Sequence, residues 1–308
     1  MPTKTSLTPF VARLDAWFAK EQRAMPWRSK PSPYNVWISE MMLQQTQVAT
    51  VIPYFQRFMT AFPTIQALAA ADLQDVLKVW EGLGYYSRAR YLHKAAQCLI
   101  DDYNAIIPND YTDIQKLPGI GPYCAAAIVS IAYEQPVPVV DGNVLRVFTR
   151  FWGIYDDISS PKVRQVLFEK LKPYCSEIKP SNFNQAIMEL GALICTPKQP
   201  KCQSCPLSKD CFALKADQVG ALPVKAKKAT VPHHDIAVAV IRKQDRVLIA
   251  KRKENQMLAG LWEFPGGKVE NNEAIESALH REVLEEVNLT VRIIKKRMAV
   301  KHAFSHFK

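Results

Sequence analysis

The sequence predicts two domains, an all-α domain followed by a smaller domain that mixes strands and helices. A chain of 308 residues exceeds the usual size of one domain, and 48% hydrophobic residues suffice for more than one core. From Leu7 to about Phe212, apolar residues recur at three- and four-residue intervals, and turn signals separate short helices without any strand pattern. Residues 213–233 are polar and interrupted by Pro, which is typical of a linker.

The charge balance favours a polyanionic partner. Lys and Arg number 40 against 29 Asp and Glu, which gives a formal net charge of +11. Many basic proteins bind no nucleic acid, so charge alone does not identify DNA. No apolar run approaches the roughly 18 residues needed to span a bilayer, and the first six residues contain no signal-peptide hydrophobic region. We therefore expect a cytoplasmic protein without a membrane segment.

Cysteine spacing indicates a metal centre. Three of the seven cysteines stand alone and are interpreted as small buried hydrophobes: Cys98, Cys124 and Cys175. An odd total in a chain expected in the cytoplasm argues against a disulfide framework. The other four crowd into one short segment and suit either zinc or an iron–sulfur cluster: Cys195, Cys202, Cys205 and Cys211. A zinc ribbon usually has two short Cys pairs, whereas six residues separate the first two of these cysteines.

A turn rich in Gly and Pro precedes an apolar helix at residues 117–122. Gly119 and Gly121 permit a tight turn and a close approach to another chain, and Pro122 suits the first position of the helix expected over 123–132. The N–H groups and positive dipole end of this helix can hold a phosphate without distinguishing bases. A helix–turn–helix that only serves packing explains the hexapeptide equally well.

Two carboxylates have distinctive surroundings. Glu40 lies in an otherwise apolar helical stretch, residues 36–46, which should raise its pKa and favour the form that donates a proton. Asp141 lies between an extended apolar segment and a new helix, where it can also be a plain N-cap. Considered singly, a structural role is the more common explanation for either acid.

Six ordered motifs within residues 23–211 together resemble the catalytic region of the MutY-type adenine DNA glycosylases, in the helix–hairpin–helix (endonuclease III) superfamily. They occupy residues 26–28, 37–50, 82–90, 117–122, 140–144 and 195–211. The resemblance implies a helical glycosylase domain over 1–212 with two lobes. A six-helix barrel would cover about 32–134, and a lobe made of 1–31 plus 135–212 would carry one [4Fe-4S] cluster on the four grouped cysteines. DNA would lie in the groove between the lobes, with the target adenine flipped out.

The same resemblance implies catalytic roles. Glu40 would be the general acid and base that protonates adenine N7, and Asp141 would stabilise the oxocarbenium-like sugar. Tyr123 and Asn143 match positions that hydrogen-bond these acids. Bifunctional glycosylase–lyases of the superfamily carry a Schiff-base Lys at the position of Tyr123, and a phenol cannot form that imine. We therefore expect a monofunctional glycosylase, a monomer whose substrate is double-stranded DNA with adenine opposite 8-oxoguanine or guanine.

Further positions match the family's substrate contacts. The adenine pocket is expected at four residues, the last at a position where some relatives carry Glu: Arg23, Trp27, Leu43 and Gln185. DNA contacts are expected from side chains inserted at the mispair and from the two hairpin glycines: Gln45, Tyr85, Gly119 and Gly121. A catalytically silent protein that binds damaged DNA is an alternative, but it does not explain Glu40 and Asp141 together.

Residues 234–308 resemble a Nudix-like domain. We expect a hairpin of strands at 236–241 and 247–250, a helix over 273–287 and a further strand at 290–294. Residues 267–289 reproduce nearly all of a Nudix box, with Asn288 where a final Gly is expected. In Nudix hydrolases such acids hold Mg²⁺ against a diphosphate, so Mg²⁺ is expected only if the box is active, at Glu282, Glu285 and Glu286.

The family resemblance gives the C-terminal domain a different task. MutY-type proteins carry a related domain that recognises 8-oxoguanine, and the matching loop contains three candidate contacts: Phe304, Ser305 and His306. Residues 234–308 are few for a Nudix fold, so we expect an incomplete α+β domain. A Nudix pyrophosphohydrolase with a helical DNA-targeting module is the alternative, and a solvated acidic helix face would explain the glutamates alone.

Overall fold

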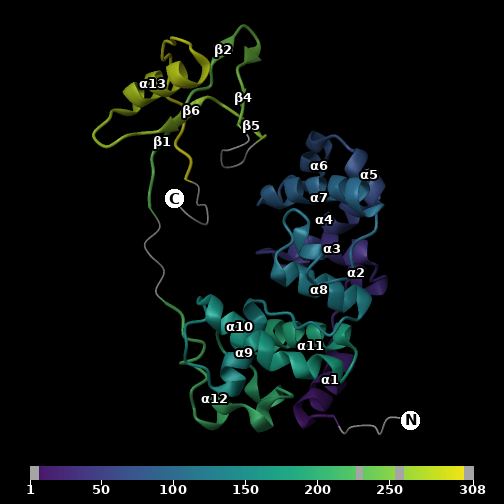
Figure 1. The fold of residues 1–308 in the computed structure, drawn as a ribbon. Helices are drawn as coiled ribbons and strands as arrows, with labels where there is room; N and C mark the ends of the chain where they lie inside the picture. The colour runs from purple at the N-terminus through teal and green to yellow at the C-terminus, as the bar shows by residue number, and fades with distance from the viewer. Residues whose placement is uncertain (1–6, 227–231, 254–259, 302–308) are drawn as a thin grey trace. The chain divides into compact units, whose positions relative to one another are not determined.

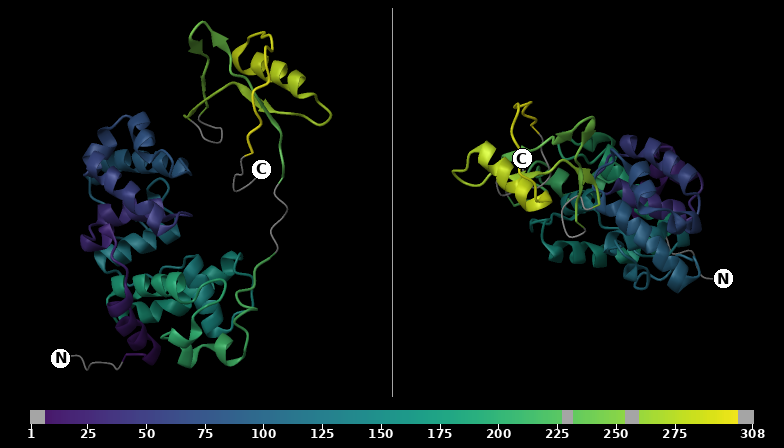
Figure 2. Two further views of the ribbon diagram at one scale, coloured as in Figure 1. Left: turned by 180° about the vertical axis from the view of Figure 1, so that it is seen from behind. Right: turned by 90° about the horizontal axis from the view of Figure 1, so that it is seen from above.

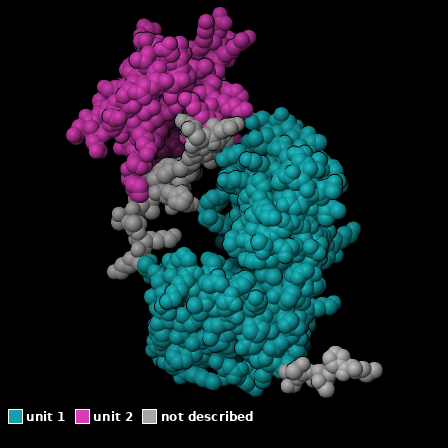
Figure 3. Space-filling view, in the orientation of Figure 1, with its two compact units in different colours: residues 1–226 teal, residues 227–308 magenta. Residues whose placement is uncertain are grey.

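The chain forms two compact units, residues 1–226 and 227–308, which are coloured separately in Figure 3. The computed structural model describes residues 7–226, 232–253 and 260–301.

Within 7–226, all regular structure that the coordinates describe is helical. The α-helices are α1 Pro9–Glu21, α2 Pro26–Ser29, α3 Pro33–Leu43, α4 Val48–Ala61, α5 Ile65–Ala70, α6 Leu73–Trp80, α7 Ser87–Tyr103, α8 Pro122–Tyr133, α9 Gly142–Trp152, α10 Pro161–Leu171, α11 Pro180–Leu193 and α12 Phe212–Lys215. Short 3₁₀ helices lie at Ile114–Lys116, Lys172–Ser176, Cys202–Ser204 and Ser208–Asp210. Pro stands in the first turn of six α-helices, where its missing N–H costs no hydrogen bond. None of the described helices is long and apolar enough to cross a membrane.

The helices of this unit gather in two lobes (Figure 1). Helix α3 packs against α4, α7 and α8, and α7 also packs against α5 and α6. The short helix α2 contacts α3 and α4, so it belongs with this lobe although the sequence placed residues 26–29 in the other. Helix α1 crosses to the second lobe and packs against α11, which also contacts α9 and, between the lobes, α8. Figure 2 shows α1, in purple, beside these later helices.

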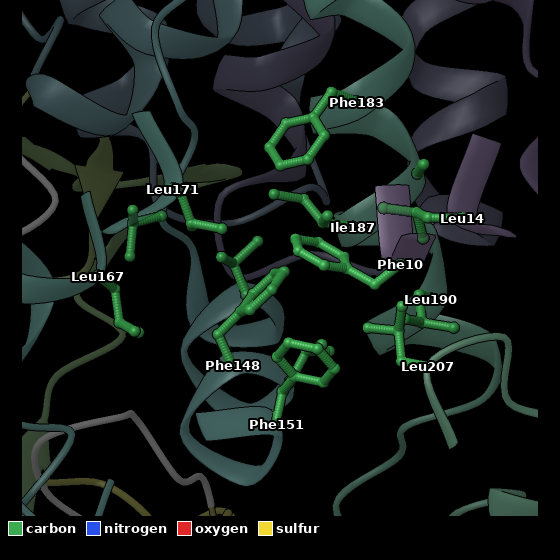
Figure 4. Close-up of a cluster of buried hydrophobic side chains, with 14 of the residues drawn as sticks. Phe10, Leu14, Phe148, Phe151, Leu167, Leu171, Phe183, Ile187, Leu190 and Leu207 are labelled. Atoms are coloured by element: carbon green, nitrogen blue, oxygen red, sulfur yellow. The ribbon is translucent and has the colours of Figure 1, made fainter. Parts of the chain in front are cut away.

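The second lobe has an aromatic core that joins the beginning of the chain to its middle. Phe10 of α1 lies between Phe151 of α9 and Tyr174, with ring centroids 5.2 and 4.8 Å away. Figure 4 shows Phe10 and Leu14 pointing toward the side chains of α9 and α11. Burying such rings stabilises the fold by a few kcal/mol each on the ~25 cal/mol per Å² scale. The N-terminal helix is therefore an integral part of this lobe.

The linker expected over 213–233 begins later in the structure. Ala213 and Leu222 are fully buried, and the carbonyl of Leu222 accepts a 2.8 Å hydrogen bond from Nε of Arg150. Polar composition suggested a free segment, but two apolar anchors and one buried guanidinium hold residues 213–226 against α9. The compact unit therefore ends at Ala226.

The second unit is a small α+β module. Its strands are β1 Ile236–Val238, β2 Arg242–Lys243, β3 Arg246–Val247, β4 Ala250–Lys251, β5 Trp262–Glu263 and β6 Gly266–Lys268, and its helix is α13 Ile275–Val287. The strands pair antiparallel as β1–β6, β2–β3 and β4–β5. Helix α13 packs on β1 and β6. The expected mixture of strands and a helix is thus present.

Two strand predictions for this unit need correction. A hairpin does form at Gln244, whose φ is +57°, but it joins only β2 and β3, whereas β1 pairs with β6. Gly266 permits that pairing, because a Cβ there would collide with the carbonyl oxygen of Ala237. The strand expected at 290–294 is absent. An extended segment becomes a strand only when it pairs, and within the described ranges no strand partners these residues.

Candidate active site

The first unit contains a cavity of about 720 Å³ where the two lobes meet. Its walls come from α2, α3, α8, α9 and α11 together with the segment after α1. Every residue predicted for catalysis and for the adenine pocket lines it: Arg23, Trp27, Glu40, Leu43, Tyr123, Asp141, Asn143 and Gln185. Residues separated by more than half of the chain thus meet at one cavity of a size that suits a small organic group.

Glu40 is a buried acid whose pKa favours retention of a proton. It projects from α3 with 5% of its surface exposed, and its Oε2 accepts a 2.6 Å hydrogen bond from the hydroxyl of Tyr123. Burial raises the pKa of Glu40 to about 7, and the charge of Asp141 adds to this rise, while the Tyr123 bond opposes it. A substantial fraction of Glu40 therefore carries a proton near neutral pH.

Asp141 is both an N-cap and a cavity carboxylate. Its Oδ1 accepts a 2.7 Å bond from the backbone N–H of Val144 at the start of α9, and its Oδ2 accepts a 2.8 Å bond from Nδ2 of Asn143. Burial raises the pKa of Asp141, whereas these two bonds favour the ionised form and oppose the rise. The helix N-terminus also favours negative charge at this position. The capping explanation and the catalytic one therefore describe the same residue.

Sequence analysis missed the arginine that holds Asn143. Arg146 lies one turn further along α9, and its Nη2 donates to Oδ1 of Asn143 at 2.8 Å and to the carbonyl of Gly191 at 2.7 Å. Its Nε donates to the carbonyl of Cys195 at 2.7 Å. Asp141 is thus connected through Asn143 and Arg146 to the first residue of the cysteine segment. The only sequence signal for Arg146 was its position three residues after Asn143, which places both side chains on one face of the helix that follows Asp141.

The side of the cavity that includes Arg23 and Gln185 contains an ion-pair group that the sequence did not reveal. Glu189 is 2% exposed, and its carboxylate binds Arg23 (Nε–Oε1 2.7 Å) and Arg28 (Nη2–Oε2 3.2 Å). Burial alone would raise the pKa of Glu189, but the hydrogen bonds from Arg23 and the charge of Arg28 outweigh it and lower the pKa. Arg28 also donates from Nε to Oε1 of Gln185 at 2.8 Å. An acid within the apolar helix 180–193 was the available signal, the same one that singled out Glu40.

The predicted DNA contacts lie on the surface outside the cavity lining. Gln45, in the loop after α3, and Tyr85, in the loop before α7, are exposed and have positive φ values of 57° and 49°. Gly119 and Gly121 are also exposed. A Cβ at Gly119 would meet Cβ of Tyr91 at 2.5 Å, so this glycine lets the turn approach α7, while Gly121 faces open space at the N-terminus of α8.

The four grouped cysteines line a second, smaller cavity beside α9, together with Arg150 and mainly apolar residues. All four are free thiols. Burial raises the pKa of Cys205 to about 12. Nη1 of Arg150 donates to Sγ of Cys195 at 3.4 Å. Within the described residues, no group of three or more His, Cys, Asp or Glu side chains is arranged to hold a single metal ion.

Two of the solitary cysteines are buried as expected, but the third differs. Cys124 and Cys175 are buried. Cys98 is only half-buried, and its Sγ lies 3.3 Å from a carboxylate oxygen of Asp102, one turn further along α7. Its helix face borders solvent, so the expectation of a buried hydrophobe was wrong at this position.

In the second unit, three acids of the predicted Nudix box form contacts with neighbouring groups of the protein. Arg281 binds Glu273 at 2.8 Å and Glu282 at 2.9 Å, and Oε2 of Glu286 accepts a 3.0 Å bond from the N–H of Gly266. The bond from Arg281 lowers the pKa of Glu273 to about 2. Asn288 adopts φ +52°, the left-handed conformation for which Asn is the usual substitute for Gly. The predicted 8-oxoguanine contacts Phe304, Ser305 and His306 lie outside the described residues.

Comparison with known proteins defines the class. Residues 38–173 match the model of the HhH-GPD superfamily base excision DNA repair proteins, and residues 237–308 match a NUDIX domain. A thermostable thymine-DNA glycosylase superposes with a TM-score of 0.61 at 27% identity, covering 67% of this chain and 95% of that one. Endonuclease III trapped covalently on DNA gives 0.59 at 25% identity, covering 70% and 99%. Fold and site therefore define a helix–hairpin–helix DNA repair protein.

Sequence similarity then gives the branch. The adenine DNA glycosylase of Buchnera aphidicola from Schizaphis graminum is 36% identical over 93% of this chain and 81% of the relative. The adenine DNA glycosylase of Mus musculus is 35% identical over 98% of this chain and 69% of the relative. The chain belongs to the adenine DNA glycosylase family.

Proposed function

We propose that this protein is a monofunctional glycosylase that removes adenine paired with 8-oxoguanine or guanine in double-stranded DNA. Family membership gives the general activity, cleavage of the N-glycosyl bond of adenine in base excision repair. One observation carries the chemistry: the buried acid Glu40, whose pKa is about 7, and the carboxylate Asp141 line the same cavity. Two carboxyl groups with different environments provide a proton donor and a charge stabiliser.

Each step of the reaction has a residue that suits it. Glu40 donates its proton to adenine N7, so the electron pair of the breaking C1′–N9 bond leaves on a neutral base. The carboxylate of Asp141, at the N-terminus of α9, stabilises the positive charge that develops on the sugar. Water then bonds to C1′ and returns its proton to Glu40. Tyr123 holds Glu40 in place through its 2.6 Å hydrogen bond and keeps its own proton.

The product is an intact abasic strand. Strand cleavage by the lyase route needs an amine that forms an imine with the sugar, and the residue beside Glu40 is the phenol of Tyr123. Borohydride treatment during turnover should therefore trap no covalent complex. A strong trapped band with the unmodified protein would show that another residue supplies the amine.

We also propose that the cysteine segment holds one [4Fe-4S] cluster. The donor set of four thiols suits iron–sulfur ligation, and all four cysteines line one cavity. The six residues between Cys195 and Cys202 also differ from the two short Cys pairs that are usual in a zinc ribbon, which favours the cluster over zinc. A bound cluster would join Cys195, Cys202, Cys205 and Cys211 and fix the segment against α9. Its effect on the active site would be structural, through the bond from Arg146 to the carbonyl of Cys195.

The partner proposed for the whole protein is duplex DNA. Gln45 and Tyr85 would enter the duplex at the mispair, and the N-terminus of α8 after Gly121 would bind a phosphate. The second unit would recognise 8-oxoguanine through residues 304–306. Arg281 pairs with Glu273 and Glu282, two acids of the box, and we propose no nucleotide hydrolysis by this unit. We propose that the protein acts as a monomer.

One assay tests these substrate assignments. Duplexes with a single adenine opposite 8-oxoguanine, guanine, thymine or cytosine would be incubated with excess protein, and free adenine would be measured. We expect release opposite 8-oxoguanine and guanine and negligible release from the two other pairs. Equal release from all four duplexes would contradict mispair specificity while leaving the glycosylase chemistry intact.

A further inference from the structure

Arg88 is a buried cation that the proposed chemistry does not use. It projects from the first turn of α7 with 5% of its surface exposed. Among the described residues, no carboxylate forms an ion pair with it, and its Nε finds no hydrogen-bond acceptor. Burial lowers the pKa of Arg88 to about 10, which still leaves it charged at neutral pH. A buried charge that makes no ion pair is expensive, so its remaining contacts need an explanation.

These contacts reach two separate loops. Nη1 donates to the carbonyls of Met41, Met42 and Gln44, at 2.9, 2.7 and 2.7 Å, in the last turn of α3 and the loop after it. Nη2 donates to the carbonyl of Gly84 at 3.1 Å and to Oγ1 of Thr46 at 3.3 Å. One rigid guanidinium therefore fixes the distance between residues 41–46 and the loop before α7.

The positive charge of Arg88 lies at the C-terminal end of α3, where the backbone carbonyls favour a cation. The last carbonyls of a helix have no partner within the helix and carry partial negative charge. Arg88 supplies donors to those carbonyls at the end of α3, the helix that carries Glu40. The cost of burial is thus offset by backbone dipoles, and the end of α3 is joined to the neighbouring loop.

Both loops present a predicted DNA-inserting side chain. Gln45 lies between two residues bonded to Arg88, and Tyr85 follows Gly84 and has its ring 5.3 Å from the guanidinium carbon. Gln45 and Tyr85 each adopt a positive φ, a conformation that costs about 1 kcal/mol for a side chain other than Gly and requires support from its surroundings. The bonds to the flanking residues of both loops provide that support.

We infer that Arg88 is a positioning residue that holds Gln45 and Tyr85 at a fixed spacing, so that they can open the base stack at the mispair together. This inference rests on the proposed insertion of those two side chains. Arg88 itself is not among the residues that line the cavity with Glu40 and Asp141. Its loss should therefore impair extrusion of a paired adenine more than cleavage of an adenine that is already unpaired.

The test compares two substrates for each variant. Single-turnover adenine release would be measured on a duplex with adenine opposite 8-oxoguanine, and on the same strand with adenine opposite a flexible abasic analogue, which removes pairing. Arg88→Met removes the guanidinium at similar length, Arg88→Lys keeps the charge with fewer directed donors, and Arg57→Met is the matched control. Arg57 also donates to a backbone carbonyl, that of Val79, but lies on an exposed face of α4.

Because unstacking a base costs a few kcal/mol, we expect Arg88→Met to slow the paired substrate about tenfold or more and the unpaired substrate by less than about threefold. Arg88→Lys should give an intermediate loss on the paired substrate, and Arg57→Met should leave both rates unchanged. Fluorescence of 2-aminopurine at the target position should show reduced flipping in Arg88→Met.

Equal losses on both substrates in Arg88→Met and Arg88→Lys would overturn the inference, because simple destabilisation affects both alike. Rates like those of Arg57→Met would overturn it as well. Gln45→Ala and Tyr85→Ala distinguish failure of the Arg88 inference from failure of the insertion proposal on which it rests. If Gln45→Ala and Tyr85→Ala selectively slow adenine release from the paired substrate and Arg88→Met does not, only the role of Arg88 is refuted. If Gln45→Ala and Tyr85→Ala leave that rate unchanged, the insertion proposal itself is refuted.

Discussion

At the scale of single residues, burial of Glu40 links its proposed role as proton donor to the stability of the fold. The folded protein holds the proton of Glu40 with a pKa of about 7, above its ordinary value of 4.5. The folded state therefore binds more protons than the unfolded state between these pH values. Its contribution to the free energy of unfolding is greatest below pH 4.5 and is lost as pH rises through 7.

We therefore predict that Glu40→Gln stabilises the protein, and more so at high pH. A neutral amide avoids the buried charge, so the gain should be on the order of 1–3 kcal/mol at pH 8.5 and small at pH 5. Thermal unfolding followed at both pH values would measure it. A Tm increase of the same size at both pH values would show that the titration of Glu40 is not the cause.

Asp141 provides a second prediction at this scale. Asp141→Asn retains an oxygen that caps α9, but a neutral amide cannot balance a positive sugar. We expect the single-turnover rate to fall by roughly 10²–10³-fold, with little change in affinity for the mispaired duplex. A variant that loses binding instead of chemical rate would show that Asp141 serves the fold alone.

Sequence predicted the two acids but not the groups that hold them. Glu40 and Asp141 stand out because an acid in an apolar stretch and an acid before a helix are local signals. Arg88 and Arg146 do not, because their partners are mostly backbone carbonyls of residues distant in sequence. Glu189 gives the same local signal as Glu40, but its partners Arg23 and Arg28 are distant in sequence. Every residue has a backbone carbonyl, so the sequence does not show which carbonyl a side chain will bind. Such contacts can be identified only in the folded chain.

At the scale of elements, the predicted helices formed largely as expected, whereas strand pairing was less predictable. Helix periodicity, Pro at helix starts and the turn at residues 117–122 are encoded locally. The partner of β1 is not, since β6 lies about thirty residues further along and the alternative hairpin is closer in sequence. Packing of α13 against both β1 and β6 explains why the distant pairing prevails.

The cysteine segment gives the prediction for this scale. Purified protein should be brown, with broad absorbance near about 400 nm, as thiolate-ligated iron–sulfur clusters are. Cys202→Ser should lose iron and colour, while Cys98→Ser, outside the segment, should keep both. Colourless protein containing one zinc per chain would contradict the cluster and support the alternative metal.

At the scale of the whole molecule, we propose that the two compact units have different functions, chemistry in the first and substrate choice in the second. All proposed reacting groups lie in residues 1–226, so the second unit should affect substrate choice and not chemistry. We predict that removing residues 234–308 reduces discrimination between 8-oxoguanine and guanine opposite adenine by about tenfold, which corresponds to about 1.4 kcal/mol. Rates on both duplexes, measured for the full chain and the shortened one, would show it.

Two results would contradict this division. Unchanged discrimination would remove the proposed role of the second unit. Magnesium-dependent hydrolysis of 8-oxo-dGTP that is lost in Glu285→Gln would instead assign the unit a Nudix activity of its own. Glu285 is a suitable probe because its side chain is 61% exposed and its nearest cation, Nη1 of Arg281, is 3.7 Å away.

If protonated Glu40 releases the adenine as proposed, the single-turnover rate should depend on pH. With adenine opposite 8-oxoguanine, the rate should fall as pH rises through about 7, because the proton donor is lost. Glu40→Gln should bind the duplex normally and lower the rate by roughly 10²–10⁴-fold at every pH. A near-normal rate in Glu40→Gln, with the same dependence on pH, would contradict the account.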